Sequence, residues 1–148
     1  MTLDNKNITL TAPLLSKLAR VIESYPEVLS GYLFGSTVTG HARKGSDMDI
    51  AVRLVPDLSA EKRFQIRLEL IDRIEKLVDR AVDVVLINDV ALIMLNQIFS
   101  YGIPVFIRDI EDEDNFKLLK QKEYFDFRHY LERDFDQMKC YFGATAHD

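Results

Sequence analysis

The hydrophobic and polar positions of the chain alternate between helix-like and strand-like spacing. Apolar residues recur every three or four positions in four stretches, at 12–23, 60–78, 89–100 and 115–142. Short apolar or alternating runs, which are typical of strands, occupy 29–34, 47–54, 81–87 and 104–108. One further helical turn is expected at 36–40. This order of elements predicts an α/β (α+β) fold, with helices packed on a small sheet and a long C-terminal helix.

Several helix ends carry their own signals. Thr11 is a candidate N-cap with Pro13 just after it, Pro26 follows the end of the first helix, and Gly102 stops the helix at 89–100. The apolar stripe expected for the helix at 60–78 consists of Phe64, Leu68, Ile71, Ile74, Leu77 and Val78.

The strand at 47–54 alternates between two faces. Met48, Ile50, Val52 and Leu54 point one way, and Asp47, Asp49, Ala51 and Arg53 point the other. Asp47 and Asp49 therefore lie on one face, roughly 6.6 Å apart along the strand. A solvated strand face would explain such a pair without any chemistry.

Asp83 lies in the next strand, which is otherwise apolar on both faces. A lone acid there costs several kcal/mol unless it is paired or binds a metal ion, and the structural alternative is pairing with Arg80 or another cation. If the two strands pair, three carboxylates meet on one face. Two like charges 4 Å apart repel by about 4 kcal/mol at an effective dielectric of 20, so such a cluster needs a compensating cation or a proton held on one carboxyl. Mg²⁺ suits it, because Mg²⁺ prefers hard oxygen ligands.

Gly35 and Ser36 form a strand-to-helix turn whose backbone N–H groups are free to face an anion. An ordinary turn with Ser36 as N-cap is the alternative. Arg43, Lys44 and Ser46 lie in the loop between this turn and the aspartates. They contact phosphate or simply solubilise the loop, and Arg43 suits phosphate best because its guanidinium binds in a bidentate manner.

Composition narrows the range of partners. The 148 residues fit one compact domain, and the net charge of −5 disfavours a large nucleic-acid interface. We see no signal peptide and no apolar run of about 20 residues, so no membrane association is expected. A single cysteine, Cys140, fits a reducing cytoplasm.

The combination Gly35-Ser36, ten residues, Asp47-Met48-Asp49 resembles the G-S-x10-D-x-D signature of the polymerase-beta-type nucleotidyltransferases, and with Asp83 it looks like the minimal nucleotidyltransferase (MNT) branch. The resemblance covers about residues 29–108. It implies a mixed sheet flanked by helices and a single nucleotidyltransferase domain over 1–148, with its core at about 12–108.

The resemblance also implies chemistry. Two Mg²⁺ ions would be held by Asp47, Asp49 and Asp83, and the third carboxylate would help to activate the acceptor hydroxyl. Gly35 and Ser36 would hold the phosphates of the substrate ATP, and Arg43 and Ser46 are candidates for the same role. Many minimal members carry arginines where this chain has Thr37 and Thr39, which weakens the expected grip on the triphosphate.

The chain leaves no room for a large acceptor domain after the sheet, and it is similar to the MNT antitoxins encoded beside HEPN-type ribonuclease toxins. That family implies transfer of AMP from ATP to a tyrosine of the toxin, and a hetero-oligomer with the toxin or a homodimer. Two alternatives remain open: an antitoxin that acts by binding alone, and a small-molecule (aminoglycoside-type) nucleotidyltransferase.

The C-terminal helix at 115–142 is rich in aromatic residues. Its apolar stripe, which we expect to dock on the sheet, consists of Phe127, Leu131, Phe135, Met138 and Phe142. The flanking aromatic residues Tyr124, Phe125, Tyr130 and Tyr141 are candidates for a partner interface. The acidic stretch 111–114 is expected to be a solvated helix start, with contact to a basic toxin surface as the alternative.

Overall fold

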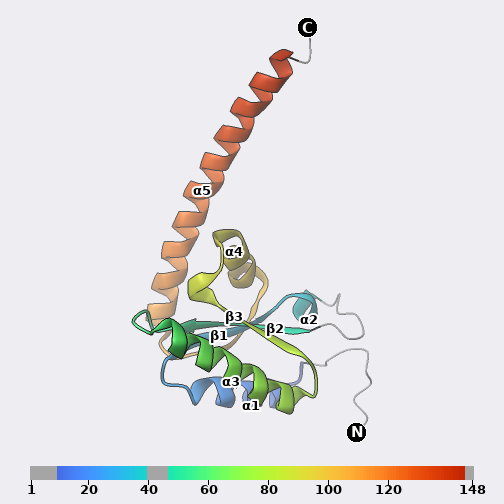
Figure 1. Ribbon diagram of the computed structural model, residues 1–148, viewed down its shortest axis with the longest axis vertical. Helices are drawn as coiled ribbons and strands as arrows, with labels where there is room; N and C mark the ends of the chain where they lie inside the picture. The colour runs from blue at the N-terminus through green and yellow to red at the C-terminus, as the bar shows by residue number, and fades with distance from the viewer. Residues whose placement is uncertain (1–9, 40–46, 146–148) are drawn as a thin grey trace.

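The computed structural model describes residues 10–39 and 47–145, and its elements follow the predicted order (Figure 1). The helices are α1 (Ala12–Glu23), α2 (Ser36–Thr39), α3 (Ala60–Val78), α4 (Leu92–Tyr101) and α5 (Ile110–Thr145), with a 3-10 turn, η1, at Ile87–Asp89. The strands are β1 (Val28–Phe34), β2 (Met48–Leu54), β3 (Val82–Leu86) and β4 (Ile103–Ile107). Every expected element is therefore present. Two of the expected signals also hold, since the Thr11 hydroxyl caps α1 and Gly102 caps the end of α4.

The four strands form one mixed sheet in the order β3-β2-β1-β4. β1 pairs antiparallel with both β2 and β4, whereas β2 and β3 run parallel. The parallel pair needs a long crossover, and α3 supplies it. The predicted fold class is confirmed: a mixed sheet flanked by helices, with a long C-terminal helix.

One face of the sheet packs against α1 and α3, which lie together below it in Figure 1. The predicted alternation of β2 is confirmed on this side, because Met48, Ile50, Val52 and Leu54 are all buried there. Leu18 and Ile22 of α1 are buried against the same core. The Nε of Arg108 donates to the carbonyl of Val28 at 2.9 Å, which fastens the end of β4 to the start of β1.

The expected apolar stripe of α3 was partly wrong. The buried series is Ile66, Leu70, Ile74 and Val78, which repeats every four residues. Phe64 and Leu68 are 58% and 48% exposed, because they lie nearly opposite that series on the helix. The sequence of α3 holds two apolar series, and a helix on a sheet can bury only one stripe.

The opposite face of the sheet is covered by α4 and the first turns of α5 (Figure 1). Its core is smaller and consists of Tyr32, Ala51, Ile87, Leu95 and Ile98. Here α4 lies over the middle of β1 and β2, and the start of α5 lies over Ser30 and Arg53. Asp49, two residues before Ala51 on the same face of β2, is only partly covered.

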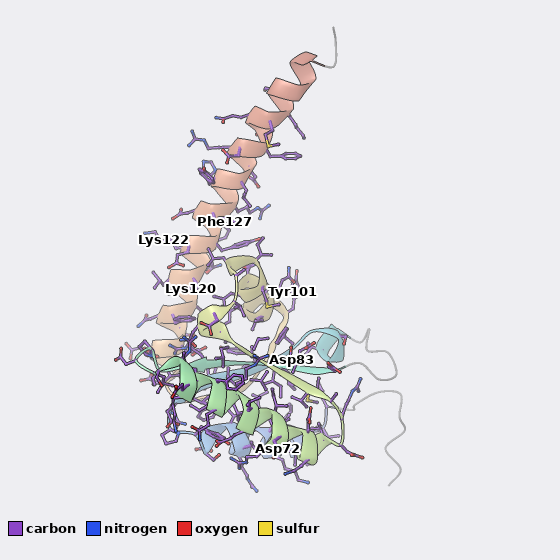
Figure 2. The ribbon with its side chains drawn as sticks, in the orientation of Figure 1. Asp72, Asp83, Tyr101, Lys120, Lys122 and Phe127 are labelled. Carbon is purple, nitrogen blue, oxygen red and sulfur yellow. The ribbon has the colours of Figure 1, made fainter. Side chains whose placement is uncertain are left out.

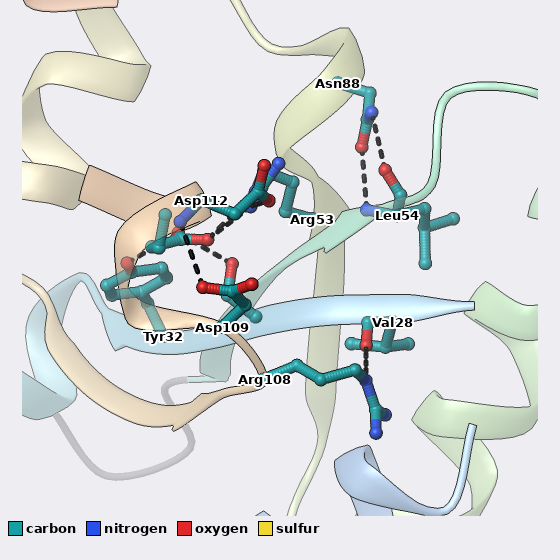
Figure 3. A network of polar contacts seen from close by, with 10 residues as sticks. Val28, Tyr32, Arg53, Leu54, Asn88, Arg108, Asp109 and Asp112 are labelled. Atoms are coloured by element: carbon teal, nitrogen blue, oxygen red, sulfur yellow. Dashed lines mark hydrogen bonds and ion pairs between the residues drawn. The ribbon is translucent and has the colours of Figure 1, made fainter. Parts of the chain in front are cut away.

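The prediction that the acidic stretch is a solvated helix start was wrong for Glu113. Its carboxylate is fully buried and accepts hydrogen bonds from Ser30 Oγ, Tyr32 Oη and Arg53 Nε at 2.8, 2.7 and 2.9 Å. Arg53 also contacts Asp112, with 2.6 Å between Nη2 and Oδ2 (Figure 3). The helix starts at Ile110, earlier than expected, and the Asp109 carboxylate accepts from the Asp112 N–H at 3.2 Å. This network fastens the base of α5 to the sheet.

Docking of the α5 stripe on the sheet is contradicted. α5 has 36 residues, about 54 Å of helix, and most of it projects away from the sheet (Figure 1). Phe127, Leu131, Phe135 and Met138 are 37%, 44%, 58% and 54% exposed. We call these four residues the α5 stripe; the side chain of Phe142 lies outside the described residues. The reason is geometric, because α4 and the first turns of α5 already cover this face of the sheet. No helix in the described parts of the chain is both long and apolar enough to cross a membrane.

Candidate functional site

Two of the three predicted carboxylates are neighbours in the sheet. In the parallel pair β2–β3, Asp49 stands directly opposite Asp83, and Asp47 lies immediately before the start of β2. Adjacent strands are about 4.8 Å apart, and residues paired across them point to the same face. The pairing of β2 with β3 is what sequence periodicity left open. The structure thus brings Asp47, Asp49 and Asp83 together, and we call them the three-aspartate cluster.

The electrostatic state of Asp49 reflects this arrangement. Burial raises the pKa of the Asp49 carboxyl above its usual value, and the nearby charges of Asp83 and Asp47 raise it further. All three causes disfavour the ionised carboxylate. A cation bound beside Asp49 would reverse the effect of the like charges. The donors are all hard carboxylate oxygens, so the residues fit Mg²⁺.

Asp83 differs from the prediction in its surroundings. Its side chain is 46% exposed rather than buried, so the desolvation argument made for it was wrong. β3 is an edge strand, and the face that carries Asp83 and Val85 is only partly covered. The structural alternative is borne out in part, because Asp83 pairs with a cation. That cation is Arg67 of α3, whose Nη2 lies 3.3 Å from Asp83 Oδ1.

This ion pair has a consequence for metal binding. Within residues 10–39 and 47–145, no three or more His, Cys, Asp or Glu side chains are arranged so that they could hold a metal ion as they stand. The carboxylate of Asp83 is engaged by Arg67. An ion bound by the whole three-aspartate cluster would therefore meet the guanidinium of Arg67 at Asp83 Oδ1.

Gly35 lies against the same cluster. It has a φ of +78°, a backbone conformation that L side chains rarely adopt. A Cβ atom at this position would stand 2.4 Å from Asp49 Oδ2, so only glycine lets the turn pass this close to the carboxylate. Phe34, just before it, pairs with Asp49 across β1 and β2. Ser36 is the first residue of α2, so Gly35 rather than Ser36 occupies the N-cap position.

The remaining predicted site residues cannot be placed. Arg43, Lys44 and Ser46 lie outside the described residues, so their predicted contact with phosphate stays a prediction. Thr37 and Thr39 belong to α2, but their side chains are not described.

Sequence reasoning missed two charged residues, Arg67 at the predicted site and Glu113 at the base of α5. Arg67 is one of several charged residues of α3, and nothing in its spacing distinguishes it from Arg63 or Arg73. Glu113 lies among four consecutive acidic residues, which all suggest a solvated helix start. The roles of both residues could be recognised only from their tertiary contacts.

A cavity of about 170 Å³ opens elsewhere, between α4 and α5. Asn96, Ser100, Lys117 and Lys120 contribute to its lining. The Nζ of Lys117 lies over the rings of Tyr32 and Phe99, and the Nζ of Lys120 over the ring of Phe116. The cavity is smaller than the roughly 300–1,000 Å³ of common ligand pockets, and none of the three aspartates lines it. We therefore do not assign a nucleotide to it.

Comparison with protein families gives one match. The family model "Polymerase beta, Nucleotidyltransferase" matches residues 16–111, which contain the Gly35 turn and all three aspartates. No curated protein matches the chain significantly in sequence.

Several solved structures share the fold. A chain of a crystal structure described as "the toxin-antitoxin with AMP-PNP" is 24% identical with a TM-score of 0.66, and the match covers 87% of this chain and 98% of that one. A chain of the tri-AMPylated Shewanella oneidensis HEPN toxin in complex with MNT antitoxin is 20% identical with a TM-score of 0.64, over 85% of this chain and 96% of that one. A chain of the toxin–antitoxin MntA–HepT is 19% identical with a TM-score of 0.63, and the match covers 86% of this chain and 98% of that one. At these identities the likeness shows the fold.

Proposed function

Because the chain belongs to the polymerase beta nucleotidyltransferase family, we propose that it transfers AMP from ATP to a tyrosine of a HEPN-type toxin and so neutralises that toxin in the cytoplasm. The observation that carries the proposal is the register of β2 and β3, which sets Asp49 beside Asp83, with Gly35 packed against Asp49. The proposal treats residues 1–148 as one nucleotidyltransferase domain.

Each residue of the site has a role in the proposal. Asp47, Asp49 and Asp83 would hold two Mg²⁺ ions. Gly35, Ser36, Arg43 and Ser46 hold the phosphates. The close approach of Gly35 to Asp49 supports this, because it brings the backbone of the turn against one of the proposed metal ligands.

The reaction would be an in-line displacement at the α-phosphorus. The tyrosine oxygen forms a bond to that phosphorus, and the bond to the bridging oxygen of the β-phosphate breaks. Pyrophosphate leaves, and Asp83 accepts the proton of the phenol. When bound, Mg²⁺ neutralises the charge that develops on the attacking and leaving oxygens.

Two observations support a protein acceptor. Structures of similar fold are toxin–antitoxin complexes, one with a tri-AMPylated HEPN toxin and one with AMP-PNP. The chain also presents the exposed α5 stripe, with Phe127 on the part of α5 that projects from the sheet that carries Asp83 (Figure 2). Exposed aromatic and Met side chains are common at protein interfaces, so the proposal places the toxin on this stripe.

The test uses two labelled forms of ATP. The chain, Mg²⁺ and the toxin encoded beside it are incubated with ATP that carries the label on either the α- or the γ-phosphate. We expect the α-label on the toxin and the γ-label in pyrophosphate. Label from the γ-position would indicate a kinase, and label on a small acceptor without the toxin would indicate the aminoglycoside-type alternative.

A binding-only antitoxin is the second candidate, and the exposure of the α5 stripe favours it as much as it favours the enzyme. The double variant Asp47→Ala/Asp49→Ala separates the two. If binding alone neutralises the toxin, cells that express this variant survive the toxin as well as cells with the wild-type chain do. If AMP transfer is required, protection is lost although the complex still forms.

The α5 stripe gives a prediction of its own. Phe135→Asp should weaken the complex with the toxin about 30-fold, since loss of an aromatic interface anchor costs about 2 kcal/mol. Phe135 is 58% exposed, so folding should not change. The measurement is a calorimetric titration of toxin with each variant. Gln137→Asp is the matched control, because residue 137 points away from the stripe on the same turn of α5. If the two variants bound the toxin with equal affinity, the α5 stripe would not be part of the interface.

A further inference from the structure

Arg67 reaches from one face of the sheet to the other. Its helix, α3, packs on the face opposite the three-aspartate cluster. The Nε of Arg67 donates to the main-chain carbonyl of Val84 at 2.6 Å, and its Nη2 donates to Asp83 Oδ1 at 3.3 Å. β3 is an edge strand, with a neighbour on one side only. The guanidinium therefore passes around the edge of the sheet to meet Asp83.

The two hydrogen bonds of Arg67 have different consequences. The bond to Val84 holds the guanidinium on the main chain of β3, whatever the orientation of the Asp83 side chain. The bond to Asp83 joins two half-exposed groups, 41% and 46% accessible, which are partly screened by water. Asp83 is thus free to turn away while the positive charge stays in place.

This arrangement sets up a competition for one carboxylate. Asp49 experiences the negative charges of both Asp47 and Asp83, and Asp83 itself is paired with Arg67. A divalent cation bound by all three aspartates needs an oxygen of Asp83, and Oδ1 of that carboxylate now accepts from Arg67 at 3.3 Å. Arg67 therefore stabilises the metal-free three-aspartate cluster and opposes the binding of a divalent cation to it.

We propose that Arg67 is a positioning residue that holds Asp83 at the edge of β3 and competes with the divalent cation, so that it raises the metal concentration at which the site fills. The inference rests on the proposed function in one respect, since it takes Asp47, Asp49 and Asp83 as the metal ligands. It concerns metal binding and does not depend on the acceptor.

The test measures binding of Mn²⁺ to the purified chain without nucleotide, by electron paramagnetic resonance of the free ion. Arg67→Gln should bind Mn²⁺ about two- to five-fold more tightly than wild type, as expected for the loss of a competing, half-exposed ion pair. Arg67→Lys keeps the charge without the fork that bonds to both Val84 and Asp83, and it should fall between the two. Circular dichroism checks that the variants keep their helices.

Arg63→Gln is the matched control. Arg63 lies one turn earlier on α3 and pairs with Asp89, so its replacement removes the same charge from another surface ion pair. In 0.15 M salt, where the screening length is about 8 Å, this variant should bind Mn²⁺ as wild type does. In an Asp83→Asn background, Arg67→Gln should likewise have no effect.

The outcomes separate this inference from the proposed function. If wild type binds Mn²⁺ and Arg67→Gln binds it equally or more weakly, competition by Arg67 is overturned while the metal site stands. If neither wild type nor any variant binds Mn²⁺, both the metal site and the inference fail. If Arg63→Gln tightened Mn²⁺ binding as much as Arg67→Gln does, the effect would be explained by net charge alone. That result would also overturn the inference.

Discussion

Asp49→Asn is expected to abolish nucleotidyl transfer and at the same time to raise the melting temperature of the metal-free chain. Loss of a shared metal ligand removes several kcal/mol of transition-state stabilisation, which corresponds to at least about a 10³-fold lower rate. The rate is measured as transfer of α-labelled AMP to the toxin. The asparagine has nearly the shape of the aspartate, so the loss reflects charge rather than packing.

The gain in stability follows from the pKa of Asp49. Burial, Asp83 and Asp47 raise it, so the folded chain binds this proton more tightly than the unfolded chain does. The stability of wild type should therefore fall as the pH rises from about 4, the ordinary pKa of an aspartate, through the raised pKa. Asparagine cannot ionise, so thermal scans of the variant at several pH values should lack this part of the fall.

Asp72→Asn is the control for both measurements. Asp72 is an exposed residue of α3 that pairs with Lys76, and it lies on the helix side of the sheet, away from Asp83 (Figure 2). Its replacement should leave transfer unchanged and shift stability by less than about 0.5 kcal/mol. If Asp49→Asn retained wild-type transfer, the three-aspartate cluster would not be the reaction site. If it lowered the melting temperature, Asp49 would be stabilised by a contact other than those described.

Most of the fold could be predicted from the sequence, because its local signals agree with one another. The alternation of β2 settles which residues face the larger core, and the caps at Thr11 and Gly102 set two helix ends within a residue. The spacing from Gly35 to Asp49 carries the resemblance that implied a mixed sheet. Pairing of β2 with β3 is a tertiary event, so only the structure could place Asp49 opposite Asp83.

The errors on α3 and α5 concern which surface covers an apolar stripe. α3 contains two apolar series, and the series that includes Ile66 and Leu70 is the one buried in the core. α5 has an apolar stripe, yet α4 and the first turns of α5 already cover the face of the sheet on which that stripe was expected to dock. In each case the pattern correctly indicates an apolar face, but periodicity does not say which surface, within the chain or on a partner, will cover it.

Glu113→Ala is expected to destabilise the chain by about 3–5 kcal/mol, because it leaves the buried Arg53 guanidinium with less compensating charge. The Glu113 side chain is 1% exposed and accepts from Ser30, Tyr32 and Arg53. Burial raises the pKa of the Tyr32 hydroxyl, and the hydrogen bond to Glu113 raises it further, so Tyr32 remains a donor at neutral pH. Asp112, the other partner of Arg53, is 55% exposed and compensates only in part. Urea unfolding followed by circular dichroism measures the change.

Glu111→Ala is the matched control for this prediction, since Glu111 lies in the same first turn of α5 and is exposed. It loses only a favourable interaction with the helix dipole, worth less than about 1 kcal/mol. Arg53→Met combined with Glu113→Ala should cost less than the sum of the two single changes, because no uncompensated charge then remains. Strict additivity would mean that the ion pair does not hold the base of α5. The same network should also affect function. Glu113 fixes the direction in which α5 leaves the sheet, and the proposed toxin surface, the α5 stripe, is part of that helix.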